Sequence, residues 1–140
     1  MVDRLSKERR SWNMSRIRGR DTQPELLVRS VLHRMGYRFR LHVRDLPGRP
    51  DIVLPKWQRI IFVHGCFWHR HSGCAQAYET KSRKRFWQQK LEGNAIRDQR
   101  VCAKLRRMGW KVSIIWECQT KKDATLKRRV GAIVHRLEHQ

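Results

Sequence analysis

The sequence predicts an α/β fold in which helices pack against a mixed central sheet, with the element order α-β-β-β-α-β-α. Apolar residues recur at helical spacing in three segments, near 23–35, 82–108 and 123–138. Residues 37–44 instead alternate between apolar and basic types, as a half-buried strand does. Short apolar runs at 51–54, 59–63 and 111–116 supply the remaining strands.

The chain divides into a basic arm and one domain. Residues 1–20 contain seven Arg or Lys residues and little periodicity, so we expect a short helix or a segment that orders only on a partner. Residues 21–140 have the length of a single domain with one core.

The helices carry recognisable ends. Thr22 can cap the first helix, Pro24 is tolerated in its first turn, and Glu25 stands where a capping box would close. Gly36 is expected to end that helix. A long second helix is expected to open at Ser82 and to stop before Gly109. Its apolar side is expected to contain Leu91, Asn94, Val101, Leu105 and Met108.

The composition indicates a polyanionic partner. Lys and Arg number 33 against 12 Asp and Glu, so the net charge is +21, spread along the whole chain. A folded nucleic-acid binder accounts for this charge, and from charge alone a generic basic surface or a ribosome-type protein is equally weighted. No apolar run approaches ~18 residues, so no membrane span is expected. The first residues lack an apolar signal region, so we expect a cytoplasmic protein.

The stretch 62–74 combines histidines, cysteines and aromatic residues directly after an apolar run. Cys66, His71 and Cys74 lie within nine residues, and Cys118 follows another strand. Three cysteines and one histidine form a closed structural zinc set, so we expect Zn²⁺ here. His69 can replace His71 on spacing alone. Free thiols or a 66–74 disulfide are the alternatives, and Cys102 is expected to be a packed thiol.

A second site is expected at the ends of the hairpin formed by residues 51–63. Asp51 begins one strand and Val63 ends the next, so the Asp51 carboxylate and the Val63 carbonyl could share a Mg²⁺ ion. His69 can take a proton from water near neutral pH. His64 and Glu25 could orient water or ligands, although Glu25 could equally serve only as a helix cap and His64 only as a core residue.

Two aromatic pairs lie in basic surroundings: Phe67-Trp68 and Phe86-Trp87. Large flat side chains beside cations stack on bases or wedge between base steps, and unstacking is least costly at a mispair. Ordinary core packing is the alternative. It is favoured for Phe86.

At these motifs the chain resembles the very-short-patch DNA mismatch endonucleases. The resemblance rests on residues 13–25, on Leu-Pro-Gly-Arg-Pro-Asp at 46–51, on Val-His-Gly-Cys-Phe-Trp-His at 63–69, and on segments 86–87 and 109–118. It implies a restriction-endonuclease-like core and a monomer that nicks one strand 5′ of the thymine in a T·G mispair. The implied setting is a bacterial, nucleoid-associated enzyme with mismatch-repair proteins as candidate partners.

The resemblance also implies roles for individual residues. Asp51 and the Val63 carbonyl would hold Mg²⁺, with His69 as the base and with Glu25 and His64 assisting. The zinc ligands would be Cys66, His71, Cys74 and Cys118. The residues that enter the DNA would be Phe67, Trp68 and Trp87 from the major groove and Met14 of the arm from the minor groove.

One feature departs from the wider nuclease superfamily, which usually has an acidic-x-Lys pair on its third strand. Here Val63-His64-Gly65 stands at that place. Two other functions remain open at this point. One is a non-catalytic zinc-dependent DNA-binding module, and the other is a nuclease of the same fold with a different target.

Overall fold

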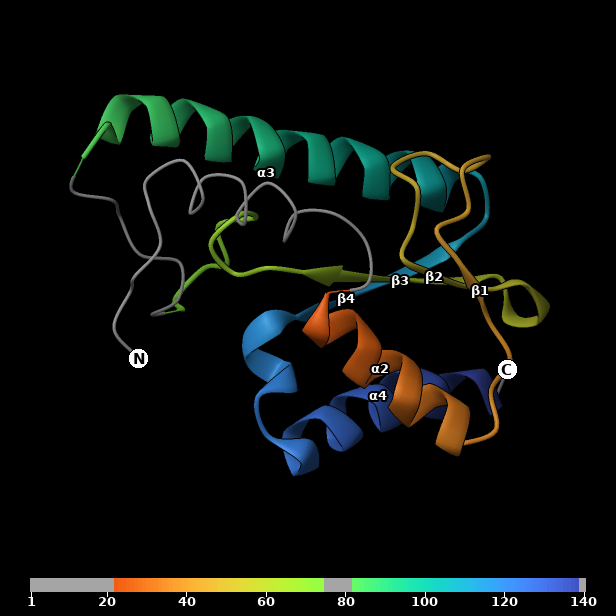
Figure 1. Cartoon of the computed structure of the whole chain (residues 1–140). Helices are drawn as coiled ribbons and strands as arrows, with labels where there is room; N and C mark the ends of the chain where they lie inside the picture. Colours follow the sequence, from red (N-terminus) through yellow and green to blue (C-terminus); the bar gives the residue numbers. More distant parts are fainter. Residues whose placement is uncertain (1–21, 75–81, 139–140) are drawn as a thin grey trace.

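The computed structural model describes residues 22–74 and 82–138, with the side chains described up to residue 135, and the predicted arm 1–20 lies outside these ranges (Figure 1). The described elements are α2 (Gln23–Arg34), β1 (Arg40–Leu41), β2 (Ile52–Leu54), η1 (Pro55–Trp57), β3 (Arg59–His64), α3 (Lys84–Arg107), β4 (Lys111–Trp116), η2 (Glu117–Thr120) and α4 (Asp123–Glu138). Apart from the two short 3-10 turns η1 and η2, this is the predicted order, so the mixed α/β class is confirmed.

The four strands form one mixed sheet in the order β1-β2-β3-β4. The first three strands are antiparallel neighbours, and β4 lies parallel to β3. Parallel neighbouring strands need a long crossover connection, and α3 lies within the connection from β3 to β4. The carboxyl ends of β3 and β4 therefore meet at the same edge, where His64 pairs in register with Trp116.

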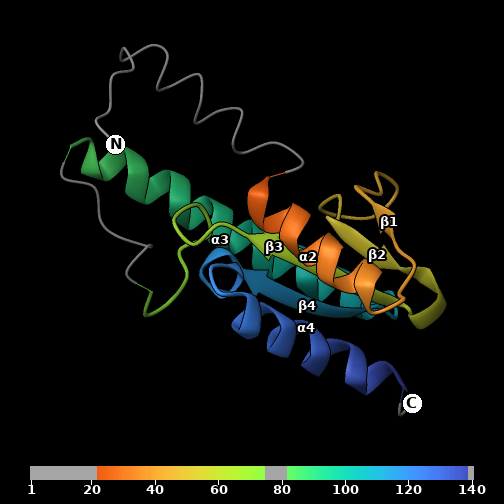
Figure 2. The same ribbon diagram turned by 60° about the horizontal axis from the view of Figure 1, so that its bottom comes forward.

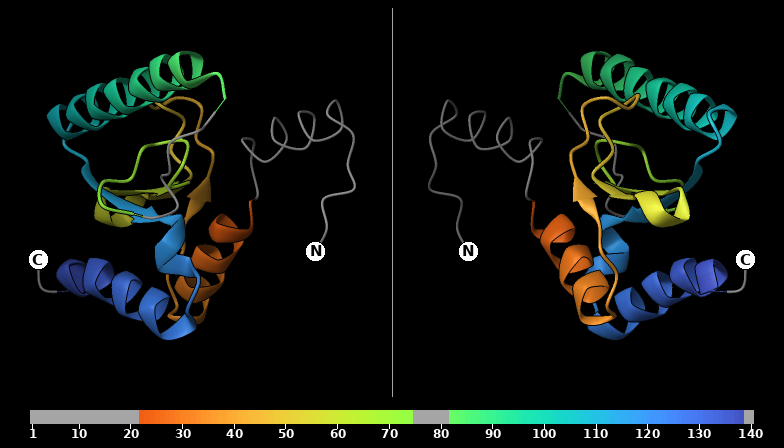
Figure 3. Two further views of the ribbon diagram at one scale, coloured as in Figure 1. Left: turned by 90° about the vertical axis from the view of Figure 1, so that its left-hand side faces the viewer. Right: turned by 90° about the vertical axis from the view of Figure 1, so that its right-hand side faces the viewer.

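The sheet separates two helical layers. Helix α3 runs along one face, and α2 and α4 lie together on the other face, as Figures 1 and 3 show from three directions. Figure 2 shows β3 and β4 between the two layers. Strand β3 is thus central, covered on both faces, and its carboxyl end opens beside α3 and the start of α2.

Alternation along the strands distributes the core between these layers. Ile52, Leu54 and Ile61 pack in a cluster with α2 and α4, whereas Val53, Ile60 and Phe62 pack in a second cluster with α3. Successive side chains of a strand point to opposite faces, so a strand buried on both sides reads as an unbroken apolar run. This explains the sequences of residues 52–54 and 59–63.

The expected ends of α2 are present. The Thr22 hydroxyl accepts a hydrogen bond from the Glu25 amide at 3.4 Å, and Pro24 lies in the first turn. Gly36, with φ of 89°, follows the last turn in the left-handed conformation that glycine adopts without steric cost.

The strand predicted at 37–44 is mostly wrong. Only Arg40 and Leu41 pair with β2, and both are exposed. The ladder stops because His42 adopts a left-handed backbone with φ of 48°. Tyr37 and Phe39 nevertheless pack against the α2–α4 cluster, so the alternation reports burial without strand pairing.

The long helix differs from expectation in two details. It begins at Lys84 rather than Ser82, after Arg83 in a left-handed conformation. Met108, expected on the apolar side, is 51% exposed, whereas Cys102 is buried against Leu105 and β3. The prediction that Cys102 is a packed thiol is confirmed. None of the described helices is long and apolar enough to cross a membrane.

Candidate active site and metal centre

The β2–β3 hairpin brings Asp51 to the end of β3. The register Ile52–Ile61 places Asp51 beside the last residues of β3, and the Val63 amide donates a hydrogen bond to Asp51 Oδ2 at 2.8 Å. One carboxylate oxygen of Asp51 is therefore fixed by the backbone amide of a residue twelve positions later in the chain. The length of the hairpin predicts that these two residues lie close together.

A glycine fixes the loop that leads to Asp51. Gly48 has φ of 75°, and a Cβ atom built on it would lie 2.5 Å from Cγ1 of Val101 on α3. Glycine at position 48 therefore lets the backbone of the loop 45–50 approach α3 more closely than a residue with a side chain would allow. This contact holds the start of β2 against the helix that carries the other half of the site.

A pocket of about 520 Å³ opens at this edge of the sheet. Its walls include Asp51, Val63, His64, His69 and Glu25, together with the aromatic residues Phe67 and Trp68. The structure therefore brings together, in one concave site, the predicted catalytic residues and two of the predicted DNA-wedge residues.

His64 and His69 form a stacked pair in the pocket. Their rings lie 3.8 Å apart between centroids with an interplanar angle of 7°. His69 Nδ1 lies 2.5 Å from Oδ2 of Asp98, and His64 Nδ1 lies 4.0 Å from the same oxygen. Because an ionised carboxylate only accepts, Asp98 fixes the proton on Nδ1 of His69 and leaves Nε2 with a free lone pair.

Asp98 is a site residue that the sequence patterns did not predict. It lies on α3 at the spacing that also buries Leu91, Cys102 and Leu105. A carboxylate on the apolar stripe of a helix is unusual, and this position is the sequence feature that could have identified Asp98 as a site residue.

Burial shifts two pKa values in opposite directions. Burial, together with repulsion from Glu25, raises the pKa of Asp51 from 3.8 to about 7, against the hydrogen bond from Val63. Burial and the neighbouring His69 lower the pKa of His64 to about 4, against the attraction of Asp98. His64 is therefore neutral at neutral pH. A bound cation would favour the ionised form of Asp51.

A charged cluster adjoins Asp51 on the side of α2. Glu25 is only 4% exposed, and its Oε2 accepts a hydrogen bond from Nη2 of Arg29 at 3.0 Å. The same Nη2 lies 3.0 Å from Nε2 of His42. Glu25, His42 and Asp51 offer ligand atoms that lie within 4.8 Å of one another. Glu25 and Asp51 are predicted site residues, whereas the sequence patterns place Arg29 and His42 only in a helix and a strand.

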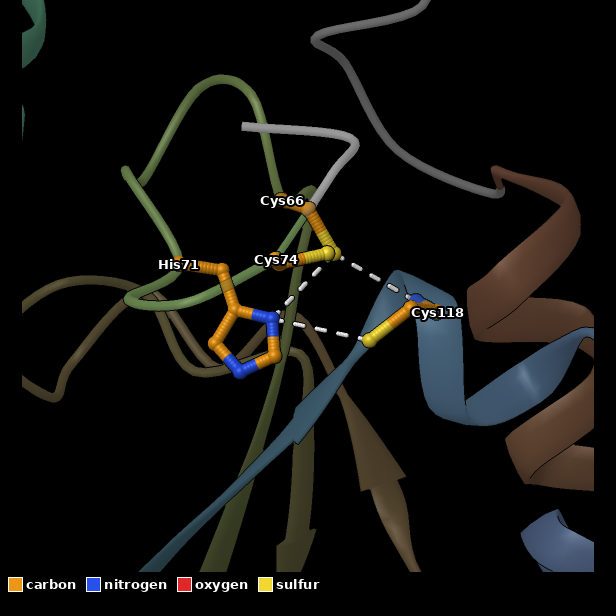
Figure 4. A group of neighbouring side chains, drawn as sticks. All are labelled: Cys66, His71, Cys74 and Cys118. Carbon is orange, nitrogen blue, oxygen red and sulfur yellow. Dashed lines mark hydrogen bonds between the residues drawn. The ribbon is translucent and has the colours of Figure 1, made fainter. Parts of the chain in front are cut away.

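The cysteine-histidine cluster lies on the other side of the end of β3. Cys66, His71 and Cys74 come from the loop after β3, and Cys118 comes from η2 after β4, as Figure 4 shows. His71 Nδ1 lies 3.6 Å from Cys66 Sγ and 3.5 Å from Cys118 Sγ. All four ligand atoms lie within 4.8 Å of one another.

This geometry fits a tetrahedral ion. Zn–S bonds of about 2.3 Å and Zn–N bonds of about 2.0 Å place neighbouring S and N ligands roughly 3.5 Å apart. The four cysteines of the described ranges form no disulfide, so the 66–74 disulfide alternative is wrong. His71, not His69, lies with the cysteines. Burial raises the pKa of the Cys66 thiol to about 12, and a coordinated cation would deprotonate it.

Trp116 connects the two sites. Its ring stacks on the ring of His71 at 4.1 Å with an interplanar angle of 9°, and it meets the His64 ring edge-on at 5.3 Å. The Glu117 carboxylate accepts a hydrogen bond from the Cys66 amide at 3.3 Å. The end of β4 thus supports both the metal cluster and the histidine pair.

The aromatic residues form one cluster, and two of them, Phe67 and Trp68, line the pocket. Trp87 lies 5.5 Å from Phe67 and 5.7 Å from Trp68, measured between ring centroids, and the Lys90 ammonium lies 5.8 Å from the Trp68 ring. Phe86 is 43% exposed beside Trp87, so the favoured core-packing alternative for Phe86 is wrong. Met14 lies outside the described residues.

A strongly basic α/β protein with a carboxylate–histidine pocket, bordered by partly exposed aromatic rings, is arranged for hydrolysis of a nucleic-acid backbone. Comparison with known proteins agrees. The family model described as "DNA mismatch endonuclease Vsr" matches residues 2–76. The chain belongs to this family of DNA endonucleases.

Similar proteins match over almost the whole chain. A "Type II nicking enzyme V.XorIIP" of Xanthomonas oryzae is 49% identical over 134 residues, which cover 96% of this chain and 98% of that protein. The "DNA mismatch endonuclease Vsr" of Escherichia coli is 40% identical, with 99% of this chain and 86% of that protein covered. A "Type II nicking enzyme V.NmeAIP" of Neisseria meningitidis is 37% identical, covering 99% and 98%.

Proposed function

We propose that this protein is a magnesium-dependent mismatch endonuclease that nicks one DNA strand on the 5′ side of the thymine in a T·G mispair. Such mispairs arise by deamination of 5-methylcytosine, and the nick would start very-short-patch repair. The observation that carries the proposal is that Asp51, His64 and His69 share one pocket with Phe67 and Trp68. The printed names of the relatives, a mismatch endonuclease and nicking enzymes, support it.

The aromatic cluster would recognise the mispair. Phe67, Trp68 and Trp87 would enter the base stack from the major groove, where a mispair is less costly to unstack than a matched pair. Asn94 Nδ2 donates a hydrogen bond to the Trp68 carbonyl at 3.1 Å, which fixes the loop that carries Phe67 and Trp68. Unstacking beside the pocket would bring the scissile phosphate to Asp51 and His69.

Hydrolysis would use a water molecule and the His69 imidazole. Asp98 accepts the Nδ1–H of His69, so that Nε2 takes the proton from water as it attacks phosphorus. The neutral His64 ring stacks on His69 and keeps its plane fixed. The products would be a 5′-phosphate and a 3′-hydroxyl.

The Asp51 carboxylate and the Val63 carbonyl would hold one Mg²⁺. Both are hard oxygen donors, and the raised pKa of Asp51 marks a buried carboxyl group whose ionised form needs a cation. The ion would stabilise charge on the phosphate and on the leaving oxygen. Glu25, adjacent to Asp51 in the pocket, would orient water in its shell.

Cys66, His71, Cys74 and Cys118 would hold a structural Zn²⁺. A closed Cys₃His set leaves no position for substrate, so its role would be to tie the loop after β3 to η2. Through Trp116, which stacks on His71 and contacts His64, the tied loop would also keep the histidine pair in place.

The remaining assignments follow from the family. The described core would be restriction-endonuclease-like, with residues 21–140 as a single endonuclease domain. Residues 1–20, with Met14, would contact the minor groove as a basic arm. The enzyme would act as a monomer on double-stranded DNA at the nucleoid of a bacterial cytoplasm, with mismatch-repair proteins as candidate partners.

Specificity is tested by incubating the protein with end-labelled duplexes that differ at one base pair, T·G against matched C·G, with Mg²⁺ or with chelator. We expect a single nick 5′ of the thymine in the T·G duplex with Mg²⁺ alone. Cleavage of both duplexes would indicate a nuclease with a different target. Tight binding without cleavage under Mg²⁺ or Mn²⁺ would indicate a non-catalytic DNA-binding module.

A further inference from the structure

The pocket contains more carboxylates than permanently positive side chains. Four carboxylate residues line its described walls: Glu25, Asp51, Asp98 and Glu117. The same walls contain no lysine and two arginines, Arg49 and Arg97. A phosphodiester that enters this pocket is itself an anion, and its oxygens gain charge as water attacks phosphorus. The guanidinium groups are therefore the protein's own means of holding the phosphate, because arginine stays charged at every working pH.

Arg49 is the arginine whose place the backbone of the loop 45–50 fixes. It adopts a left-handed conformation with φ of 45°, directly after Gly48, and its amide donates a hydrogen bond to the Leu46 carbonyl at 3.1 Å. The contact between Gly48 and Val101 holds this turn against α3. Arg49 lies two residues before Asp51, so its side chain reaches the pocket from the wall that carries the proposed metal ligand.

Packing gives no reason for a side chain at position 49. Arg49 is exposed, and glycine would adopt φ of 45° without the steric cost that arginine bears. An unfavourable backbone conformation that the surrounding structure maintains at the edge of a pocket points to a function for the side chain that it directs.

The Arg49 guanidinium is available to a ligand. It makes no hydrogen bond or ion pair with any of the residues that the structure describes. Arg29, not Arg49, is the arginine whose charge lowers the pKa of Asp51, against the larger effect of burial. Arg29 is in turn bound to Glu25 at 3.0 Å. Arg49 thus keeps all its donors for an anion that enters beside Asp51.

We propose that the Arg49 guanidinium binds the scissile phosphate by donating hydrogen bonds to one of its non-bridging oxygens. Arg49 transfers no proton. Its fixed charge offsets the negative charge that develops on the phosphate oxygens as water attacks, and its planar fork orients the phosphate over Asp51. The inference rests on the proposed function, because the phosphate concerned is the one 5′ of the thymine in the mispair.

The test measures binding in magnesium-free buffer, where the proposed reaction cannot proceed. T·G duplexes carry one methylphosphonate, in which a neutral methyl group replaces a non-bridging oxygen, at the scissile position or at either neighbouring phosphate. At the scissile position we expect the methylphosphonate to raise the Kd of the wild type about 10-fold and that of Arg49→Ala less than about 2-fold, because the variant has already lost the contact. At the neighbouring positions both proteins should lose the same factor.

Single-turnover nicking with Mg²⁺ is measured on the unmodified T·G duplex. Arg49→Ala should nick about 10²-fold more slowly, and Arg49→Lys should recover part of the rate, because an ammonium retains the charge but not the fork. Arg49→Gly should behave as Arg49→Ala does and should be at least as stable as the wild type, since glycine accommodates the left-handed backbone. It therefore decides the question even where Arg49→Ala does not fold.

The matched control is Arg44→Ala, which removes the same charge five residues earlier, at an exposed residue that does not line the pocket. It should nick at the wild-type rate and show the full effect of the scissile methylphosphonate. A scissile methylphosphonate that weakens the Arg49 variants as much as the wild type would overturn the proposal. So would a difference confined to a neighbouring phosphate, or wild-type nicking by the folded Arg49 variants.

Nicking by the wild type separates this proposal from the proposed function. A wild type that nicks the T·G duplex, but whose response to the scissile methylphosphonate does not depend on Arg49, would contradict the role of Arg49 alone. A wild type that cleaves no duplex, but shows the expected dependence on Arg49, would contradict the proposed function and support the phosphate contact.

Discussion

Replacing Asp51 by asparagine should make the metal-free protein more stable while it removes activity. Burial raises the pKa of Asp51 from 3.8 to about 7, so above pH 7 the fold must hold an ionised carboxylate that the unfolded chain solvates better. The shift corresponds to roughly 4 kcal/mol as an upper limit. The neutral amide keeps an oxygen that can accept the Val63 amide hydrogen bond, but it also buries an NH₂ group. We therefore expect a net gain of about 2 kcal/mol at pH 8.

The sign of this effect depends on pH. Because the folded pKa is raised, the contribution of Asp51 to stability is fully present below pH 3.8 and is lost as the pH rises through about 7. Wild type and Asp51→Asn should thus have similar unfolding free energies near pH 4 and should diverge up to pH 8. Urea unfolding of zinc-loaded, magnesium-free protein at several pH values measures the difference.

The matched control is Asp123→Asn, which neutralises a carboxylate at the exposed start of α4 and should produce no such stabilisation. Added Mg²⁺ should stabilise the wild type but not Asp51→Asn, because the proposed site loses its one charged ligand with the Asp51 carboxylate. An Asp51→Asn protein that is equally or less stable at pH 8, or that still nicks DNA at the wild-type rate, would refute the reasoning.

Three further predictions concern other parts of the site. Asp98→Asn should lower the single-turnover nicking rate about 10²–10⁴-fold, because the amide no longer fixes the His69 tautomer, while the Kd for a T·G duplex stays unchanged. Gly48→Ala should destabilise the protein by about 1–3 kcal/mol through strain and the close approach to Val101, as measured by urea unfolding, and Val101→Ala should recover part of this loss. Cys118→Ala should remove bound zinc, measured by a chelator dye, and lower the free energy of unfolding by about 3–10 kcal/mol.

Each of these predictions can fail. A normal nicking rate in Asp98→Asn would show that the contact with His69 is structural only. A Gly48→Ala protein of wild-type stability would contradict the tight docking of the loop 45–50 on α3. Full zinc content in Cys118→Ala would exclude Cys118 from the ligand set.

Local sequence signals predicted most of the fold. The apolar run 111–116 and the helical spacing of apolar residues in 123–138 predict the observed bounds of β4 and α4, because apolar side chains of both elements pack in the core. The strand predicted at 37–44 failed, because its alternation also suits an extended segment that packs without pairing. The left-handed backbone of His42, which ends the ladder, has no signal in the sequence.

For the site, residues near one another in the chain were the predictable ones. Cys66, His71 and Cys74 lie in one loop, and Asp51 and Val63 lie in one hairpin, so spacing alone brought each set together. Asp98 meets His69 from α3, and Arg29 meets His42 from α2, and only the packing of these helices on the sheet brings each pair together. Their contacts depend on tertiary structure that local patterns do not encode.

The most direct test is the single-turnover nicking of a T·G duplex, with protein in excess over DNA and Mg²⁺ present, by the wild type, Asp51→Ala and His69→Ala. Duplex binding by each protein is measured at the same time. We expect the wild type to nick and both variants to bind the duplex but to nick at least about 10²-fold more slowly. Wild-type nicking rates in both variants would contradict the assignment of this pocket as the catalytic site.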